Sequence, residues 1–293
     1  MKIGLQIPRF TWPGGPPALA SKLAEIAQAA EEAGFASIWV MDHYFQLPGL
    51  GDVSEPMLEG YSALNFLAAV TKRVRLGTLV AGVIYRHPAF LIKQATTLDV
   101  LSGGRAYFGV GAGWFEREAR GLGFPFPSVK VRFEWLEETL QLTRQMWSGN
   151  EEPFEGQHFQ LAEPLCQPMP LSTPHPPILI GGMGEQKTLR FVAQYGDACN
   201  LFLRAGYETL KHKLAVLQAH CDDVGRPYEE IERTTLGTVH LAPDEMEPDE
   251  VLEICRRLAD LGFQQAIFNM PNVHNIEPLE RFGQDIILAA ASL

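Results

Sequence analysis

The chain has 293 residues, of which 46% are hydrophobic and 20% are charged, and its formal net charge is −11. This length suits one large α/β domain, so we assign residues 1–293 to a single domain. The negative charge argues against a nucleic-acid partner and against binding to an anionic membrane surface. An anionic ligand would therefore be held locally, by backbone amides or by a few well-placed cations.

The start of the chain has no signal-peptide pattern, and no apolar run approaches the ~18 residues of a membrane span. The four cysteines form no CxxC pair and no metal-binding spacing with histidines. We therefore expect reduced thiols and no metal site. Together these observations predict a cytoplasmic protein.

Eight apolar runs of strand type follow one another along the chain, separated by segments with apolar residues three and four positions apart. The runs are KIGLQIP, ASIWVM, RVRLGTLVAG, AYFGVG, PILIGG, ACNLF, TTLGTVHLA and QAIFNM. Such alternation favours a parallel sheet with right-handed crossovers, and eight units in roughly 250 residues predict a (β/α)8 barrel of the TIM type. A doubly wound open α/β sheet is the alternative, but no GxGxxG turn follows the first run.

Three segments are longer than an ordinary loop between a strand and a helix, namely 42–59, 113–130 and 151–177. We expect them to be insertions in the βα loops of the barrel. They either form the walls of a pocket or decorate the outside of the barrel.

Asp42 and His43 directly follow the second apolar run. Active sites of such barrels lie at the carboxyl ends of the strands, so both side chains are expected on the functional face. A histidine there can donate a hydrogen bond or move a proton near neutral pH. The alternative is structural: Asp42 caps a turn and His43 is an ordinary hydrogen-bonded residue.

Glycines mark the ends of two later runs. Gly109, Gly111 and Gly113 in GVGAGW leave room above the backbone for a flat or bulky group. The turn at residues 181–185, GGMGE, precedes a segment of helical period, and the bare amides of a helix N-terminus favour an anion. A plain tight turn is the alternative. A P-loop is excluded because Gln186 stands where that motif requires glycine.

Taken together, these segments resemble the bacterial luciferase-like superfamily of flavin and deazaflavin oxidoreductases. The resemblance covers nearly the whole chain and is strongest in LGTLVAGVIYRHPAFLIKQATTLDVLSGGRAYFGVGAGW. The segments RFEWLEETLQLTRQMWSG, FEGQHFQL, PPILIGG and DACN follow in the order of the family. Within the superfamily, the chain is most similar to the branch that depends on coenzyme F420, a 5-deazaflavin.

The resemblance implies a barrel with the cofactor ring at the carboxyl ends of the strands and a non-prolyl cis peptide at Leu79–Val80. It places Asp42 and His43 near the pyrimidine side of the ring, and it implies a homodimer. The cofactor-binding residues that it implies are Leu79, Val80, Ala81, Gly111, Ala112, Gly113, Gly181, Gly182, Met183, Gly184 and Glu185.

One position departs from the pattern of the family. Relatives that oxidise a sugar phosphate carry a catalytic glutamate just after the glycines of the fourth strand, where this chain has Trp114. We therefore expect a different reaction, with His43 as the proton donor or acceptor and a hydrophobic or partly aromatic substrate. The aromatic side chains expected to line the substrate pocket, unless they belong to the core, are Phe10, Trp12, Trp114, Phe115 and Phe202.

The resemblance favours an oxidoreductase that transfers a hydride between F420 and a small organic substrate. His43 and Asp42 would be its catalytic residues, with Asp42 orienting His43 or bonding the ring. An FMN-dependent monooxygenase that uses oxygen is one alternative, because the same fold and anion-binding turn would serve it. A non-catalytic flavin- or deazaflavin-binding protein on the same barrel is the other.

Overall fold

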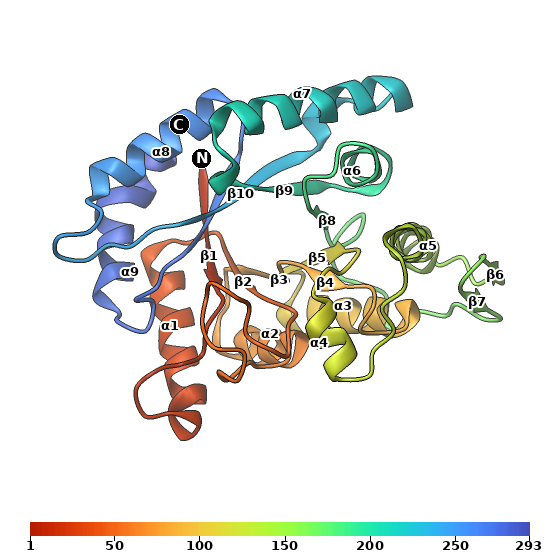
Figure 1. Ribbon diagram of the computed structural model, residues 1–293, viewed down its shortest axis with the longest axis horizontal. Coiled ribbons are helices and arrows are strands. Elements are labelled where there is room, and N and C mark those ends of the chain that lie inside the picture. The colour runs from red at the N-terminus through yellow and green to blue at the C-terminus, as the bar shows by residue number, and fades with distance from the viewer.

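One closed sheet of nine strands forms the centre of the computed structural model, which describes all 293 residues (Figure 1). All eight predicted runs contribute to this sheet, and the third run supplies two short strands. The strands are β1 (Lys2–Ile7), β2 (Ser37–Val40), β3 (Arg75–Thr78), β4 (Ala81–Gly82), β5 (Ala106–Gly111), β8 (Ile178–Gly181), β9 (Ala198–Phe202), β10 (Glu232–Thr238) and β11 (Gln265–Asn269). Every neighbouring pair is parallel, and the pairing of β3 with β5 closes the ring, so the predicted TIM-type barrel is confirmed.

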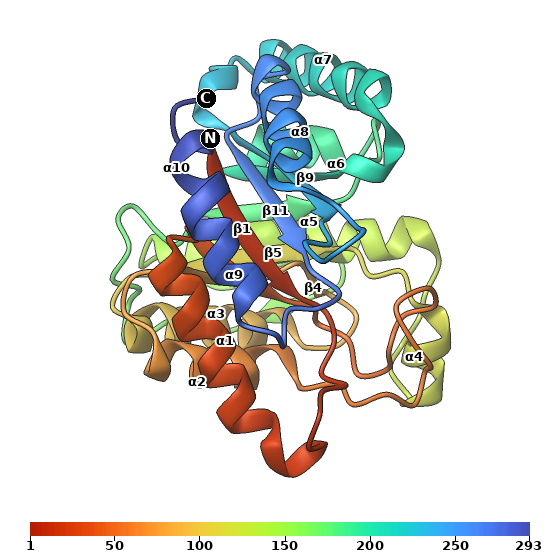
Figure 2. The same ribbon diagram turned by 90° about the vertical axis from the view of Figure 1, so that its left-hand side faces the viewer.

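Helices surround the barrel on its outside (Figures 1 and 2). They are α1 (Leu19–Ala33), α2 (Gly60–Val70), α3 (Pro88–Ser102), α5 (Val129–Trp147), α6 (Thr188–Tyr195), α7 (Tyr207–Val224), α8 (Pro248–Asp260) and α9 (Glu277–Phe282), which continues through a π-helical turn (Gly283–Ile287) into α10 (Leu288–Ala290). Short 3₁₀ turns occupy Pro16–Ala18, Leu203–Ala205 and Tyr228–Glu230. Each long helix turns an apolar stripe to the sheet, as α1 does with Leu23, Ile26 and Ala30. The two ends of the chain meet, because the Met1 amino group donates to the Ala290 carbonyl (2.6 Å).

Two of the three long segments are βα loops, as predicted. Segment 42–59 follows β2, and segment 113–130 follows β5 and contains the short helix α4 (Glu116–Gly121). Segment 151–177 instead follows α5 and leads into β8, so it is a connection from a helix to a strand. It begins with the hairpin of β6 (Phe154–Glu155) and β7 (Gln160–Leu161), which lies beyond α5 in Figure 1. No helix has the length and apolar character needed to cross a membrane.

The core consists of a large shell between the sheet and the helices and a small cluster inside the barrel. The inner cluster consists of Trp39, Tyr107, Leu179, Ala198 and Ile267. Three partly buried side chains pack on this cluster at the carboxyl ends of the strands, and we call this end the mouth of the barrel. These are Leu79, Val80 and Leu236. The barrel is therefore filled with side chains and opens only at its mouth.

The peptide bond between Leu79 and Val80 is cis, as the resemblance implied, and it separates β3 from β4. The glycines of neighbouring strands make room for this corner. A Cβ atom on Gly111 would lie 2.9 Å from Val80 Cγ2, and one on Gly181 would lie 2.8 Å from the same atom. A Cβ on Gly109 would lie 1.9 Å from a backbone oxygen of β3. The predicted space above the glycines is thus real, but the β3–β4 corner of the same chain fills it.

Candidate active site

The segments that follow β2 and β5 meet beside the mouth of the barrel, and Glu118 of α4 joins them. Its Oε1 lies 2.9 Å from Nδ1 of His43. Its Oε2 accepts hydrogen bonds from the backbone N–H of Tyr44 (2.5 Å) and of Phe45 (2.7 Å). The hydroxyl of Tyr85 donates to Oε1 as well. A single buried carboxylate therefore accepts hydrogen bonds from four groups of two other segments.

The imidazole of His43 is 12% exposed and lies among aromatic rings. The ring centroids of Trp114 and Phe115 are each 5.9 Å from that of His43, and that of Tyr85 is 6.4 Å away, all edge-on. His43 Nδ1 is engaged by Glu118, whereas Nε2 has no hydrogen-bond partner within the chain. One ring nitrogen is thus fixed and the other is free for a ligand.

The environment of Glu118 keeps its carboxyl group ionised. Complete burial on its own would raise the pKa of Glu118, but the hydrogen bond and charge of His43, with the backbone amides, hold that pKa below its ordinary value. Burial and the contact with Glu118 raise the pKa of Tyr85 well above its usual range, so Tyr85 remains a donor at neutral pH. The site therefore holds a permanent negative charge directly behind His43.

Asp42 faces a different partner from the one expected. Its carboxylate is buried and pairs in bidentate fashion with Arg86, with Nη1–Oδ2 and Nη2–Oδ1 distances of 2.7 and 2.8 Å. The N–H of Gly82 also donates to it (3.2 Å), and Arg86 reaches Glu59 as well (2.5 Å). Asp42 consequently anchors its loop to the residues after β4, and the residue that orients His43 is Glu118.

Backbone amides without partners gather at the ends of the adjacent strands β5 and β8. None of the N–H groups of residues 112–114 or of residues 182–187 makes a hydrogen bond within the chain. Gly182 has φ = 122°, a conformation that suits glycine, and α6 begins directly after this turn. The two segments therefore present donors at one edge of the mouth, as an anion such as a phosphate requires.

Glu185 serves the anion-binding turn through its backbone rather than its carboxylate. The carboxylate pairs with Lys213 (2.5 Å) and His212 (3.1 Å), and its backbone oxygen accepts from His220 (2.8 Å). These contacts tie the turn to α7. Met183 contacts the neighbouring strand, with its sulfur 3.5 Å from the N–H of Phe202.

The aromatic residues expected in a substrate pocket divide into two groups. Phe10 and Trp12 are almost completely buried in the outer core, 1% and 7% exposed, so they do not line an open pocket. Phe115 is also buried, whereas Trp114 is 60% exposed and stacks on it with centroids 5.2 Å apart. Trp114 is therefore the open aromatic wall beside His43.

The mouth fits a planar cofactor with a phosphate group. Leu79 and Val80 form a partly exposed apolar floor, while Ala81 is buried beneath them. The unpaired amides after β5 and β8 form the donor set. An apolar floor next to a row of donors suits a ring system joined to a phosphate.

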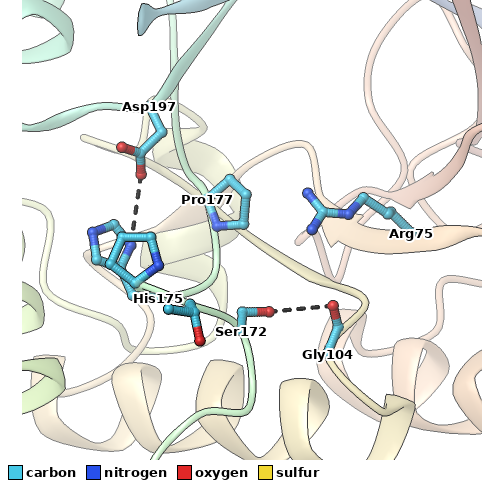
Figure 3. A pocket seen from close by; sticks show the side chains of 8 residues that line it. Arg75, Gly104, Ser172, His175, Pro177 and Asp197 are labelled. Atoms are coloured by element: carbon cyan, nitrogen blue, oxygen red, sulfur yellow. Dashed lines mark hydrogen bonds and ion pairs between the residues drawn. The ribbon is translucent and has the colours of Figure 1, made fainter.

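A hollow of about 430 Å³ lies at the opposite end of the barrel (Figure 3). It is lined by residues that precede strands, including Arg75, His175 and Asp197. In Figure 3, His175 faces Asp197 (Nδ1–Oδ2, 3.7 Å), and the Ser172 hydroxyl donates to the Gly104 carbonyl (3.2 Å). Because barrel enzymes react substrates at the carboxyl ends of their strands, we assign this hollow no part in the active site.

Sequence reasoning missed Glu118 and Arg86. Glu118 lies in an ordinary amphipathic stretch, FEREARG, and its contacts join residues far apart in the chain. Arg86 was visible in the RHP motif, but nothing local indicated that its partner is Asp42. Only a known pairing of the loops after β2, β4 and β5 could have revealed either residue.

The chain matches the family model described as luciferase-like monooxygenase over residues 1–284, and it belongs to this family. A relative in Kineococcus radiotolerans, an F420-dependent glucose-6-phosphate dehydrogenase, is 32% identical over 82% of this chain and 69% of its own length.

Two solved structures are similar in fold. An F420-dependent secondary alcohol dehydrogenase in complex with an F420–acetone adduct has a TM-score of 0.83 at 19% identity, over 99% of this chain and 98% of that one. The oxygenating constituent of 3,6-diketocamphane monooxygenase from Pseudomonas putida, in complex with FMN, has a TM-score of 0.79 at 15% identity, over 98% of both chains.

Proposed function

We propose that this member of the luciferase-like monooxygenase family is an oxidoreductase that transfers a hydride between coenzyme F420 and a small, uncharged organic substrate. One observation carries the proposal: His43 has a buried carboxylate on Nδ1, no partner on Nε2 and the exposed ring of Trp114 beside it. The F420-dependent relative in Kineococcus radiotolerans supports the choice of cofactor.

The mouth of the barrel would hold the cofactor. Leu79 and Val80 would support the ring, and the amides of residues 112–114 and 182–187 would bind its phosphate group. When bound, the deazaflavin supplies the ring carbon that accepts or donates the hydride. The protein contributes position, hydrogen bonds and the exclusion of water.

The surroundings of His43 favour a substrate without a phosphate or carboxylate group. Its ring contacts are aromatic, and the cation nearby in the chain, Arg86, is already paired with Asp42 and Glu59. A charged group on the substrate would find no free partner among these side chains. An alcohol or carbonyl compound of apolar character fits better, and Trp114 would pack against it.

His43 would handle the proton that accompanies hydride transfer. Its free Nε2 would accept the proton of a substrate hydroxyl as the hydride leaves the adjacent carbon, or return a proton to a carbonyl oxygen in the reverse direction. The carboxylate of Glu118 would balance the charge of the imidazolium that forms. Trp114 and Phe115 would cover the reacting atoms.

Binding titrations with F420 and with FMN, followed by tryptophan fluorescence, test the choice of cofactor. We expect saturation at micromolar F420 and weaker binding of FMN, followed by reduction of F420 with members of an alcohol panel in the absence of oxygen. A Trp114→Phe variant identifies how much of the signal comes from the mouth of the barrel.

Two outcomes would replace the proposal. Tight FMN binding with substrate-dependent oxygen uptake would favour the monooxygenase alternative, which the FMN-bound relative supports. Saturable binding without turnover over a broad panel would favour a non-catalytic binding protein. The homodimer implied by the resemblance also stays a prediction, which sedimentation velocity tests.

A further inference from the structure

We infer that Glu118 is a positioning residue that holds His43 in the tautomer with its proton on Nδ1, leaving Nε2 as a hydrogen-bond acceptor. The catalytic meaning of this arrangement rests on the proposed function, whereas the tautomer is a property of the protein alone. His43 remains the residue that would touch the substrate, and Glu118 acts through it.

The contact with Glu118 determines which nitrogen carries the proton. An ionised carboxylate only accepts hydrogen bonds, so the Nδ1 atom 2.9 Å from Oε1 must be the donor. The hydrogen bonds from Tyr44, Phe45 and Tyr85 stabilise the ionised carboxylate in the same way. Neutral imidazole has one N–H, and therefore the Nε2 of neutral His43 carries a lone pair.

The carboxylate is also held rigidly. Its Oε2 is fixed by two consecutive backbone amides of the loop after β2, and its Oε1 by the Tyr85 hydroxyl that follows β4. The carboxylate itself belongs to α4, after β5. Three loops at the mouth thus converge on Glu118, so that the orientation of the His43 ring is set by the scaffold before any ligand binds.

A second buried carboxylate shows what a purely structural role looks like. Glu138 in α5 accepts hydrogen bonds from the amides of Gln157, His158 and Phe159, at 2.8 to 3.1 Å, and it touches no imidazole ring. Both of its oxygens are used by backbone amides. Glu118 gives one oxygen to amides and reserves the other for His43 and Tyr85, and this asymmetry is what distinguishes a positioning residue from an anchor.

The tautomer has a direct consequence for hydride transfer. In the oxidation of an alcohol, the electron pair of the C–H bond moves with its hydrogen to the deazaflavin, the C–O bond becomes a carbonyl, and the hydroxyl proton goes to Nε2. Only the tautomer with a bare Nε2 can take that proton. The imidazolium then has a proton on each nitrogen, with Glu118 facing the one on Nδ1, and it returns the proton on Nε2 to solvent or, in the reverse reaction, to the substrate.

The first test is a ¹⁵N NMR spectrum of histidine-labelled wild-type protein at about pH 8.5, where unperturbed imidazoles are neutral. The His43 signals are assigned by comparison with a His43→Gln variant. We expect a protonated Nδ1 and an unprotonated Nε2 for His43. The opposite pattern would overturn the inference without the need for any Glu118 variant.

The second test is Glu118→Gln. The amide oxygen of glutamine can still accept from Tyr44 and Phe45, which places its NH₂ group at the Oε1 position, where it donates to Nδ1. We expect the His43 proton to move to Nε2. Glu138→Gln is the matched control: it removes a loop-anchoring carboxylate and is expected to leave the His43 signals unchanged. A Glu118→Gln protein with the wild-type tautomer would contradict the inference.

Kinetics separate this inference from the proposed function. With F420 and an active alcohol, Glu118→Gln is expected to lower kcat by roughly 10²-fold or more, the size of a general-base contribution, while the Kd for F420 stays near that of the wild type. An unchanged kcat with a reversed tautomer would remove the catalytic part of the inference. If no turnover with F420 exists at all, the proposed function fails while the NMR spectra still decide the role of Glu118.

Discussion

The two ends of the barrel both gather polar and aromatic side chains, but they differ in how far these groups satisfy one another. At the amino end, Asp197 accepts a hydrogen bond from the N–H of Ile178 (2.8 Å) and faces both His175 and Arg226. The Ser172 hydroxyl contacts Asp99 and Gly104 there. The hollow at this end is therefore lined by groups that are largely paired.

The mouth of the barrel retains hydrogen-bonding groups that the chain does not use. His43 Nε2 and the backbone amides after β5 and β8 have no partner within the chain, and Trp114 is open to solvent. Buried polar groups in proteins are almost always paired, so unused ones beside a solvent-accessible aromatic ring indicate a place for a ligand. The comparison teaches that unused hydrogen-bonding capacity, rather than the volume of a hollow, distinguishes the functional end.

Replacing His43 is the most direct way to break this comparison. We expect His43→Gln to lower kcat with F420 and an alcohol by about 10²–10⁴-fold, because the proton would lose its acceptor. The melting temperature should change little, since Nε2 has no partner within the chain. His175→Gln at the amino end is the matched control and should leave turnover unchanged. A reversal of these two results would move the active site to the other end of the barrel.

The buried pair of Asp42 and Arg86 should matter for stability more than for chemistry. Asp42→Asn leaves the guanidinium with one carboxylate instead of two, and breaking a buried pair in this way costs about 3 kcal/mol. Urea unfolding monitored by circular dichroism measures this loss. Lys2→Met removes an exposed pair with Glu232 and should cost less than about 1 kcal/mol.

A stability loss in Asp42→Asn as small as that of the surface control would mean that the buried pair does not anchor the loop after β2. A large drop in turnover at temperatures where the variant stays folded would instead return Asp42 to the catalytic role expected from the sequence. Either result would sharpen the division of labour between Asp42 and Glu118.

The anion-binding turn can be tested through one glycine. Gly182→Ala places a side chain at φ = 122°, so the turn must rearrange and its amides lose their alignment. We expect the Kd for F420 to rise about tenfold, the equivalent of one hydrogen bond. Gly225→Ala is the control, because Gly225 has a positive φ of 67° at the end of α7 with open space around it. Equal binding by both variants would show that this turn does not hold the phosphate.

Much of the fold could be predicted because it depends on local patterns. The apolar runs correspond to all the strands of the barrel, since buried parallel strands are continuous apolar segments. The glycines after β5 and the turn after β8 were visible for the same reason. The third long segment was misplaced between a strand and a helix because length alone does not tell which two elements a loop joins.

The site was harder to predict because its residues interact across long stretches of chain. Glu118 and His43 are 75 positions apart, and Arg86 and Asp42 are 44 positions apart, so neither pair has a local signal. Phe10 was expected in the pocket, yet an aromatic residue after a strand fits a core equally well. Packing in three dimensions decides such cases, and the sequence has no period that reports it.

The smallest expected effect concerns the acid stability of the mouth. The pKa of Glu118 in the folded protein is lower than in the unfolded chain, so its ionised form stabilises the fold above the unfolded pKa of about 4.5, and this contribution disappears as the pH falls through the folded pKa. Glu118→Gln lacks the contribution at every pH. The difference in unfolding free energy between the wild type and this variant should therefore be larger at pH 7 than at pH 3, as urea unfolding at both values would measure. Glu116→Gln removes an exposed carboxylate from the same helix and serves as the control. If the difference between the wild type and Glu118→Gln did not depend on pH, the carboxylate would not be held in its ionised form by His43 and the amides, and the contrast between the two ends of the barrel would lose its electrostatic basis.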